Sequence, residues 1–384
     1  MNETHNTPLE FAVVLGRVPR LSVREIEATI VRSGRQLHNL TVTSGVALVK
    51  VSPDLDDAWF LSLGGALKYG QVVERIARDD SALPELLIRH VGNAHTIGLS
   101  ALGADIQLAK LGSQVKKEVP TLRRFIIPQE ATLLSAASAK GIGDDGSEWL
   151  ILASDKEYAL VRIKLSQQID DLTNRDRNLP AADARRGMLP TKLARMMVNI
   201  ALGTMADEQP LLLDPFCGTG RALIEAMLVG SHVLGSDSDP LAIEASRANL
   251  AWAAQTYQLP NYDPDQLILA EIAKIGRLLS PGTIDAIATE PFLGPPLTRK
   301  PTAVERDQLF IQLLPLYEDL LRAGQLLLKP SGRLVAVFPI IDSQSLFTRI
   351  VDSLPRFGYH LLDSIVVARS DQWIARDIVL LRKQ

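Results

Sequence analysis

The feature that most limits the fold is a regular alternation of apolar runs and helix-like segments over the C-terminal half of the chain. The apolar runs lie at 211–216, 232–237, 267–272, 284–291 and 332–339. They are largely continuous rather than alternating with polar residues, which is typical of strands buried on both faces of a parallel sheet. Helix-like segments separate them, so the sequence predicts an α/β fold with a doubly wound sheet over residues 191–384.

The N-terminal half has a different pattern, in which short strands mix with amphipathic helices. Residues 1–83 indicate one small α+β unit, and residues 84–166 indicate a second. Residues 167–190 are polar, rich in Asp and Arg and interrupted by prolines, so we expect a linker there. A chain of 384 residues is too long for one ordinary core, which agrees with two or three domains.

Two local predictions concern helices of the first unit. Ser22 is followed three residues later by Glu25, a spacing that indicates a capping box at the start of a helix. Residues 54–70 have a helix-like distribution of apolar side chains.

Composition argues against several classes of protein. The apolar fraction of 46% and the charged fraction of 22% are ordinary for soluble globular proteins. No apolar run reaches the roughly 18 residues that a membrane-spanning helix needs, and the N-terminus lacks the pattern of a secretory signal. The single cysteine, Cys217, cannot form an intrachain disulfide, so we expect a cytoplasmic protein.

The stretch LLLDPFCGTGRALIEA, residues 211–226, is the most specific motif. A strand ends at Asp214, a turn with Gly218, Thr219 and Gly220 follows, and a helix begins. Glycines in such a turn let a ligand lie against the backbone. The spacing matches neither the dinucleotide fingerprint nor the phosphate loop, so it favours a ligand without phosphates.

About 20 residues further on, as the ribose-binding pattern requires, the next strand ends at Asp237. Together with the glycine turn, an acid at this place indicates a nucleoside without phosphates, and S-adenosylmethionine fits. Its cationic amino-acid end would lie near Asp214 and its ribose near Asp237. The neighbouring Asp239 is better explained as a helix cap, and Cys217 as a packed residue. For Glu271, which follows the third strand, a contact with the adenine amine and a solvent-exposed acid are equal alternatives.

Glu290 follows the strand IDAIAT and begins the stretch EPFLGPP. Ligands of doubly wound sheets bind beyond the carboxyl ends of the strands, so Glu290 should face the same place as Asp214 and Asp237. A carboxylate and a backbone carbonyl can accept hydrogen bonds from an exocyclic amine and stabilise the charge that it develops. Glu290, the carbonyl of Pro291 and the stacking ring of Phe292 are therefore the catalytic candidates.

These motifs resemble those of class I amino-methyltransferases that use S-adenosylmethionine. More narrowly, the residues 174–201, which include GMLPTKLA, are similar to the linker and first helix of THUMP-domain tRNA guanine-N2-methyltransferases, which modify guanosine 10 of tRNA. The stretch VLGRVPRLSVREIEA resembles the start of their N-terminal ferredoxin-like domain, and WIARDIVLLRK resembles their closing strand. The resemblance implies a ferredoxin-like domain over 1–83, a THUMP domain over 84–166 and a Rossmann-like methyltransferase domain over 191–384.

The resemblance also implies the roles of particular residues. The cofactor S-adenosylmethionine would contact Asp214, Phe216, Gly218, Thr219, Gly220, Asp237 and Glu271. RNA would contact the basic side chains of Lys116, Lys117, Arg123, Arg124, Arg175, Arg177 and Arg186. For the arginines of 167–190, solvent exposure without RNA contact is an equal alternative. No metal site is expected. Relatives in eukaryotes act with a small zinc protein, so the expected partners are tRNA and, as an option, a small activating protein.

The fourth motif departs from the family, where it reads Asp-Pro-Pro-Tyr-Gly. Here Glu290, Pro291 and Gly294 align, but Leu293 occupies the place of the tyrosine. Glutamate is longer than aspartate by one carbon–carbon bond, roughly 1.5 Å. Since a misplacement of about 1 Å can cost about a hundredfold in rate, the loop must be shifted, the substrate must differ or activity must be lost. Because the cofactor motifs are intact, we expect a shifted loop.

The expected activity is methyl transfer to the exocyclic N2 amine of a guanosine in tRNA, at position 10. One alternative is amino-methylation of another nucleic acid, such as rRNA or DNA adenine. DNA enzymes of this chemistry usually carry a target-recognition domain, whereas this chain has two small α+β units. The other alternative is a non-catalytic RNA-binding module, which only the altered fourth motif supports.

Overall fold

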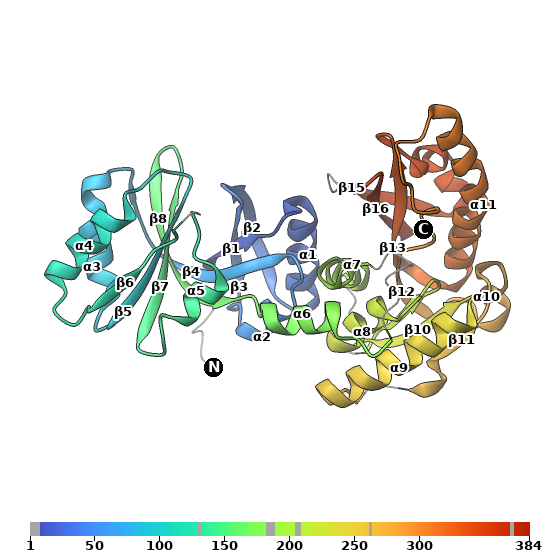
Figure 1. Cartoon of the computed structure of the whole chain (residues 1–384), viewed down its shortest axis with the longest axis horizontal. Coiled ribbons are helices and arrows are strands. Elements are labelled where there is room, and N and C mark those ends of the chain that lie inside the picture. The colour runs from blue at the N-terminus through green and yellow to red at the C-terminus, as the bar shows by residue number, and fades with distance from the viewer. Residues whose placement is uncertain (1–7, 130–131, 182–188, 204–208, 261–262, 369–371) are drawn as a thin grey trace, which may run out of the picture. The chain divides into compact units, whose positions relative to one another are not determined.

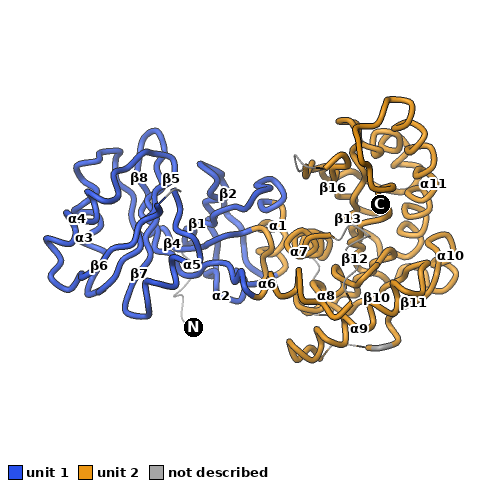
Figure 2. The backbone as a smooth tube through the Cα atoms, viewed as in Figure 1, with its two compact units in different colours: residues 1–23, 33–61, 66–170 blue, residues 24–32, 62–65, 171–384 orange. Residues whose placement is uncertain are grey.

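The computed structural model describes residues 8–129, 132–181, 189–203, 209–260, 263–368 and 372–384. The chain divides into two compact units (Figures 1 and 2). Unit 1 consists of Met1–Val23, Ser33–Leu61 and Ala66–Asp170, and unit 2 consists of Arg24–Arg32, Ser62–Gly65 and Asp171–Gln384. Each unit contains one large β-sheet.

The N-terminal part of the chain supplies the sheet of unit 1 and its helices. The strands are β1 (Leu9–Leu15), β2 (Gln36–Thr43), β3 (Val46–Ser52), β4 (Ala66–Ala77), β5 (Thr96–Leu102), β6 (Arg124–Ile126), β7 (Gly146–Ala153) and β8 (Glu157–Ser166). The helices are α1 (Pro19–Arg32), whose second half belongs to unit 2, α2 (Asp57–Leu61), the 3-10 turn η1 (Asp80–Ala82), α3 (Leu83–Val91), α4 (Leu108–Glu118) and α5 (Ala136–Lys140).

A single sheet runs through unit 1 in the order β2-β3-β1-β4-β8-β7-β5-β6. The 12-residue strand β4 pairs with β1 on one side and with β8 on the other, where Tyr69 lies opposite Leu165. The two α+β units expected from the sequence, 1–83 and 84–166, therefore share one sheet, because β4 is long enough to pair with both halves.

Helices α3 and α4 cover one face of this sheet around a core that includes Trp149 and Leu160. In α3, Leu83, Leu86, Leu87 and Val91 are buried at helical spacing, so one apolar stripe faces the strands. The opposite face has a second core, which includes Val14, Leu150 and Val161. Both faces of the sheet are thus packed.

Two local predictions for the first unit are wrong. Helix α1 begins at Pro19, so Ser22 lies inside it and donates to the carbonyl of Val18 instead of capping it. The helix expected over 54–70 ends at Leu61, and β4 begins at Ala66. The buried carboxylate of Glu25 accepts hydrogen bonds from the backbone NH groups of Gly64 and Gly65, each at 2.8 Å, so it is engaged away from Ser22, and residues 64–65 are not helical.

Unit 2 has eight strands in its sheet. They are β9 (Leu211–Asp214), β10 (His232–Asp237), β11 (Leu267–Leu269), β12 (Ile284–Thr289), β13 (Leu328–Ile341), β14 (Gln344–Ser345), β15 (Tyr359–Val367) and β16 (Ile374–Lys383). Its further helices are α6 (Ile169–Arg177, mostly in this unit), α7 (Thr191–Leu202), α8 (Arg221–Leu228), α9 (Pro240–Tyr257), α10 (Ile272–Leu278) and α11 (Ala303–Leu327), with the 3-10 turns η3 (Pro264–Gln266), η4 (Leu346–Arg349) and η5 (Val351–Phe357).

The strand order of unit 2 is β11-β10-β9-β12-β13-β16-β15. Neighbours from β11 to β13 are parallel, and β16 is antiparallel to both β13 and β15. Helices α7, α8 and α9 pack on one face, while α10 and α11 pack together on the other (Figure 1). The prediction of a doubly wound α/β sheet is confirmed. The strand order reverses between β9 and β12, since β10 and β11 follow on one side of β9 whereas β12 and β13 follow on the other, and this is the place where such folds bind ligands.

The stretch 167–190, expected to be a linker, contains the helix α6 in its described part. Leu172 and Arg175 of this helix are buried. Burial of one face explains why a polar sequence forms a helix here. In the described part of the chain, none of the helices has the length and apolar character to cross a membrane.

Candidate active site

The turn between β9 and α8 begins with the carboxylate of Asp214, which is buried at the end of its strand. Asp214 Oδ1 accepts a hydrogen bond from the backbone NH of Phe216 at 3.1 Å and one from the hydroxyl of Thr289 at 2.6 Å. Thr289 is the last residue of β12. This contact therefore joins the carboxyl ends of the two parallel strands between which the strand order reverses.

The glycines of this turn adopt conformations that other residues rarely adopt. Gly218 has φ 52° and Gly220 has φ 83°. A Cβ atom on Gly220 would lie 2.5 Å from Leu250 Cδ1, whereas one on Gly218 would meet nothing within 4 Å. Gly220 is thus required by packing, and Gly218 leaves open space beside the turn, as a ligand lying on the backbone would need.

The second acid, Asp237, ends β10 and contacts the same turn. Its Oδ2 accepts a hydrogen bond from the backbone NH of Gly218 at 3.0 Å, and its Oδ1 accepts one from the NH of Asp239 at 3.0 Å. Asp239 itself caps α9 by accepting from the NH of Leu241. The expectation that Asp239 is a helix cap is confirmed, and Asp237 is placed beside the glycine turn.

Burial raises the pKa of Asp214 to about 7, and the hydrogen bonds from Thr289 and Phe216 oppose this rise only in part. The negative charges of Asp237 and Glu290 raise it further. Asp237 and Glu290 therefore both lie within electrostatic range of Asp214, and we call Asp214, Asp237 and Glu290 the acidic cluster. Its chemistry fits a ligand with a positive charge and hydroxyl groups, since a cation favours the charged form of each acid.

Glu290 follows β12 directly, and its side chain is only 11% exposed. Its partner is Arg376 of β16, whose Nε donates to Glu290 Oε1 at 2.6 Å and whose Nη2 lies 3.5 Å from Oε2. Burial raises the pKa of Glu290, and the guanidinium of Arg376 opposes this rise. The catalytic candidate is thus a paired, mostly buried carboxylate.

The residues after Glu290 differ in their exposure. Pro291 is buried, whereas the side chain of Phe292 is 59% exposed. The carbonyl of Phe292 accepts a hydrogen bond from the hydroxyl of the fully buried Tyr317 at 3.3 Å. Gly294 has φ 109°, so the backbone turns sharply two residues later. Tyr317 therefore anchors the backbone of this loop, and the ring of Phe292 is left accessible.

Two further candidates differ in burial. Glu271 lies just before α10, is 61% exposed and forms an ion pair with Lys274 at 3.1 Å. Cys217 is buried next to the hydroxyl of Ser246, and burial raises the pKa of its thiol. A thiol that stays protonated suits a packed residue and not a nucleophile.

The basic side chains proposed to contact RNA fall into two groups. Lys116, Lys117, Arg123 and Arg124 are exposed in unit 1, in the last turn of α4 and just after it. Arg177 is exposed at the end of α6. Arg186 lies outside the described residues.

The prediction that Arg175 contacts RNA is wrong. Its guanidinium is buried and lies beside Asp171 and Glu225, with Nε donating to Glu225 Oε1 at 2.7 Å. Arg195 Nε donates to the other oxygen of Glu225 at 2.5 Å. Arg175 is therefore part of a buried ion-pair network and is not available to a phosphate.

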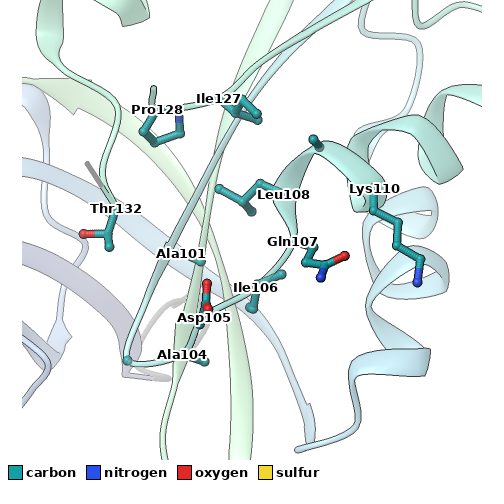
Figure 3. A pocket seen from close by; sticks show the side chains of 12 residues that line it. Ala101, Ala104, Asp105, Ile106, Gln107, Leu108, Lys110, Ile127, Pro128 and Thr132 are labelled. Carbon is teal, nitrogen blue, oxygen red and sulfur yellow. The ribbon is translucent and has the colours of Figure 1, made fainter. Parts of the chain in front are cut away.

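Unit 1 contains a pocket of about 850 Å³ at the other end of α4 (Figure 3). Its wall comes from the loop after β5, the first turn of α4 and the loop after β6, with Ala101, Asp105, Gln107, Leu108, Ile127 and Thr132 among the lining residues. The pocket and the basic side chains of Lys116 and Lys117 thus lie at opposite ends of one helix.

Sequence reasoning missed Arg376, Tyr317 and Thr289. Arg376 had a usable signal, since it and Asp377 are charges directly before the apolar run of residues 378–381 in one strand. Tyr317 and Thr289 had none, because a tyrosine in a long helix and a threonine in a strand are ordinary core residues.

Comparison with known proteins also indicates a methyltransferase domain in the part of the chain that forms the acidic cluster and the glycine turn. Residues 181–350 match the family model described as RMKL-like, methyltransferase domain. Two curated relatives are named tRNA (guanine(10)-N2)-dimethyltransferase. The protein of Methanothermobacter thermautotrophicus is 34% identical over 158 residues, and that of Pyrococcus abyssi is 32% identical over 151 residues.

These matches cover 41% and 39% of this chain and 43% and 39% of the relatives, so the chain matches less than half the length of either relative. The crystal structure of TrmN from Thermus thermophilus has a TM-score of 0.56 and 18% identity, and the alignment covers 98% of this chain and 100% of that one. At this identity the likeness shows the fold alone. Over residues 181–350, the chain therefore has the sequence pattern of an RMKL-like methyltransferase domain.

Proposed function

We propose that the protein transfers a methyl group from S-adenosylmethionine to the exocyclic N2 amine of a guanosine in tRNA, at position 10. The observation that carries this proposal is the convergence of Asp214, Asp237 and Glu290 at the carboxyl ends of parallel strands. The match to a methyltransferase domain supports the reaction class. The names of the two relatives support the choice of tRNA and of guanosine 10.

The turn after β9 would hold the cofactor. Asp237 would accept hydrogen bonds from the ribose hydroxyls, as acids at the end of the second strand do in related folds. Asp214 would face the cationic amino-acid end, and the open space at Gly218 would let the ligand lie on the backbone. Phe216, Thr219 and Gly220 shape the turn. Glu271, exposed after β11, would accept from the adenine amine.

The loop after β12 would hold the base. Glu290 and the carbonyl of Pro291 would accept hydrogen bonds from the amine, and the exposed ring of Phe292 would stack on the base. When bound, S-adenosylmethionine would supply a methyl group on a positively charged sulfur. That sulfur would keep the electron pair of the broken bond when the amine nitrogen takes the methyl carbon, and the amine would release a proton to water. Glu290 stabilises the positive charge that develops on the nitrogen.

Unit 1 would bind the body of the tRNA through Lys116, Lys117, Arg123 and Arg124, which are exposed and close together in sequence. Phosphate contacts position an RNA without reading its sequence. Recognition by shape suits a chain with a net charge of −3. A tRNA substrate and one buried free cysteine agree with a cytoplasmic location.

A methyl-transfer assay tests the proposal. Purified protein would receive S-adenosylmethionine labelled in its methyl group, together with unmodified tRNA transcripts, rRNA fragments or DNA. We expect label in tRNA, and N2-methylguanosine or N2,N2-dimethylguanosine at position 10 after nuclease digestion and mass spectrometry. A transcript with adenosine at position 10 is the matched control and should remain unlabelled.

The other outcomes separate the alternatives. Label in rRNA or DNA but not in tRNA would contradict the proposal and favour another nucleic acid. Retained tRNA binding without label in any substrate would favour a non-catalytic module. Activity that appears only when a cell extract is added would show that a partner protein is required.

A further inference from the structure

Glu290 and Arg376 form an ion pair that links two strands which are not neighbours in the sheet, and the proposed function alone does not explain this contact. β12 and β16 are not neighbours, because β13 lies between them. In the registers of these strands, Thr289 lies opposite Ala336 of β13 and Arg376 lies opposite Pro339 of β13. Glu290 comes one residue after Thr289, so its side chain reaches past β13, and about two residues further along it, to meet the guanidinium.

This reach depends on the length of glutamate. An aspartate at 290 would end one carbon–carbon bond earlier, roughly 1.5 Å. Its carboxylate could not keep the 2.6 Å contact with Arg376 Nε without movement of the loop. The loop is held, because Tyr317 donates to the carbonyl of Phe292. Glu290 and Arg376 are thus matched in length.

The two oxygens of Glu290 are used unequally. Oε1 accepts the short hydrogen bond from Arg376 Nε, whereas Oε2 has only the 3.5 Å contact with Nη2 among the residues that the structure describes. An oxygen at 3.5 Å from a donor is at most weakly bonded. Oε2 therefore keeps lone pairs for a further donor.

We propose that Arg376 is a positioning residue of the methyl-transfer site, which holds Glu290 ionised and turned so that Oε2 accepts a hydrogen bond from the substrate amine. This inference rests on the proposed function and adds a residue to it. Arg376 contacts neither substrate nor cofactor in this role, since it acts through Glu290.

The charges around Glu290 explain why it needs a cation. It faces Arg376 from β16, the carboxyl of Asp214 from β9 and the neutral hydroxyl of Tyr317 from α11. Burial raises its pKa, and Arg376 is the cation that opposes this rise. Without Arg376 the carboxylate would gain a proton more readily, and a protonated Oε2 would lose its role as an acceptor.

The decisive measurement is the pH dependence of kcat for the wild type and for Arg376→Gln. We expect kcat of the variant to fall on the order of tenfold to a hundredfold at pH 6.5, the size expected for a lost positioning contact. It should recover as the pH rises, because the acid limb of its profile moves to higher pH. KM for S-adenosylmethionine should change less than twofold. Arg376→Lys should move the acid limb of the kcat profile part of the way back toward its wild-type position, because lysine also carries a positive charge.

Two further variants sharpen the test. Glu290→Asp recreates the family's acid but loses the contact with Arg376, so we expect its kcat to fall by about tenfold or more. Arg382→Gln is the matched control, because Arg382 is exposed at the far end of the same strand and lies opposite Arg333. An acid limb that stays in place in Arg376→Gln, or full activity in Glu290→Asp, would overturn the inference.

A second readout needs no substrate. The folded-state pKa of Glu290 is raised above its unfolded value, so ionisation costs stability as the pH rises through the folded pKa. The loss between pH 5 and 8, to which Asp214 also contributes, should be larger in Arg376→Gln than in the wild type, and Glu290→Gln in that background should remove the excess. If the wild type and Arg376→Gln lose the same stability between pH 5 and 8, the inference is contradicted, even if no tRNA is methylated. If the wild type is merely inactive, only the proposed function is contradicted.

Discussion

At the scale of single residues, Asp214 is the group whose protonation the fold controls most directly. Its pKa is about 7 in the folded protein, mainly because the carboxyl is buried and has two acids near it. Near neutral pH it therefore exchanges between a neutral and a charged form. A cationic ligand beside it favours the charged form, so binding should release a proton.

We predict that the affinity for S-adenosylmethionine rises with pH between 5.5 and 7.5 and then levels off. Below the pKa of Asp214, each pH unit should weaken binding up to about tenfold, since one proton must leave. Calorimetric titration at several pH values measures this dependence. Asp214→Asn should bind more weakly, and its affinity should not vary over this range. A constant affinity in the wild type would show that Asp214 does not face the cation.

Gly218 offers a second test at this scale, because strain and ligand contact can be separated. An alanine there adopts a strained φ of 52° but collides with no protein atom. We expect Gly218→Ala to lower the free energy of unfolding by about 1 kcal/mol and to weaken cofactor binding at least tenfold, because its methyl group occupies the open space. Thermal unfolding and calorimetric titration give the two numbers.

Gly282→Ala is the matched control for this prediction. Gly282 has φ 65° and lies in the turn before β12, away from the glycine turn, and a Cβ atom on it would meet nothing within 4 Å. Its stability loss should equal that of Gly218→Ala, but its cofactor affinity should be unchanged. Equal affinity in both variants would mean that no ligand lies against Gly218.

At the scale of elements, α6 shows that an apparent RNA-binding segment is partly structural. Arg175 and Arg195 both donate to Glu225, so one carboxylate holds α6 and α7 against α8. Arg177 lies two residues further along the same helix and is exposed. Substitution of Arg175 should therefore affect mainly stability and substitution of Arg177 mainly tRNA binding, although the two residues look alike in the sequence.

We predict that Arg175→Ala lowers the free energy of unfolding by about 3 kcal/mol, as expected when a buried ion pair loses one partner. Arg177→Ala should change it by less than about 0.5 kcal/mol but should weaken tRNA binding. Urea unfolding and filter binding at several salt concentrations measure these effects. A stable Arg175→Ala protein with a reduced salt dependence of binding would restore Arg175 as an RNA contact.

Elements also show what the sequence could and could not predict. The strands and the glycine turn of unit 2 were predictable, because their signals are local: apolar runs such as Ile284–Thr289 and glycines at fixed spacing. Glu25 was not, since its partners Gly64, Gly65 and Asn199 lie 39, 40 and 174 residues away. The same holds for the contact of Glu290 with Arg376, 86 residues apart. Long-range pairs leave no periodicity in a sequence.

At the scale of the whole molecule, the acidic cluster and the four basic side chains proposed to contact RNA lie in different units. The acidic cluster belongs to unit 2, whereas Lys116, Lys117, Arg123 and Arg124 belong to unit 1. A negative site repels a polyanion, so an enzyme for tRNA needs positive contacts elsewhere on the chain. Affinity for RNA and chemistry at the base should therefore respond to different substitutions.

We predict that replacing Lys116, Lys117, Arg123 and Arg124 together by alanine raises KM for tRNA and leaves kcat at saturating tRNA within about twofold. Each phosphate contact contributes about 0.7 to 0.9 to the magnitude of the slope of log K against log salt, so loss of four contacts should reduce that magnitude by up to roughly 3.5. The affinity for S-adenosylmethionine should not change, because the glycine turn lies in the other unit. Filter binding from 50 to 300 mM salt, ionic strengths over which such contacts are strongly screened, measures the slope.

Arg89→Ala is the control for this prediction. Arg89 is exposed in the same unit, but its guanidinium is already paired with Glu74 at 2.6 Å and with Glu85 at 3.1 Å. Its loss should leave the salt slope unchanged, since a paired arginine has no free charge to offer a phosphate. If the fourfold variant also keeps its slope, these side chains only face solvent, and the grip on tRNA must come from another surface. If kcat falls while the slope stays, the substitutions have disturbed unit 1 itself.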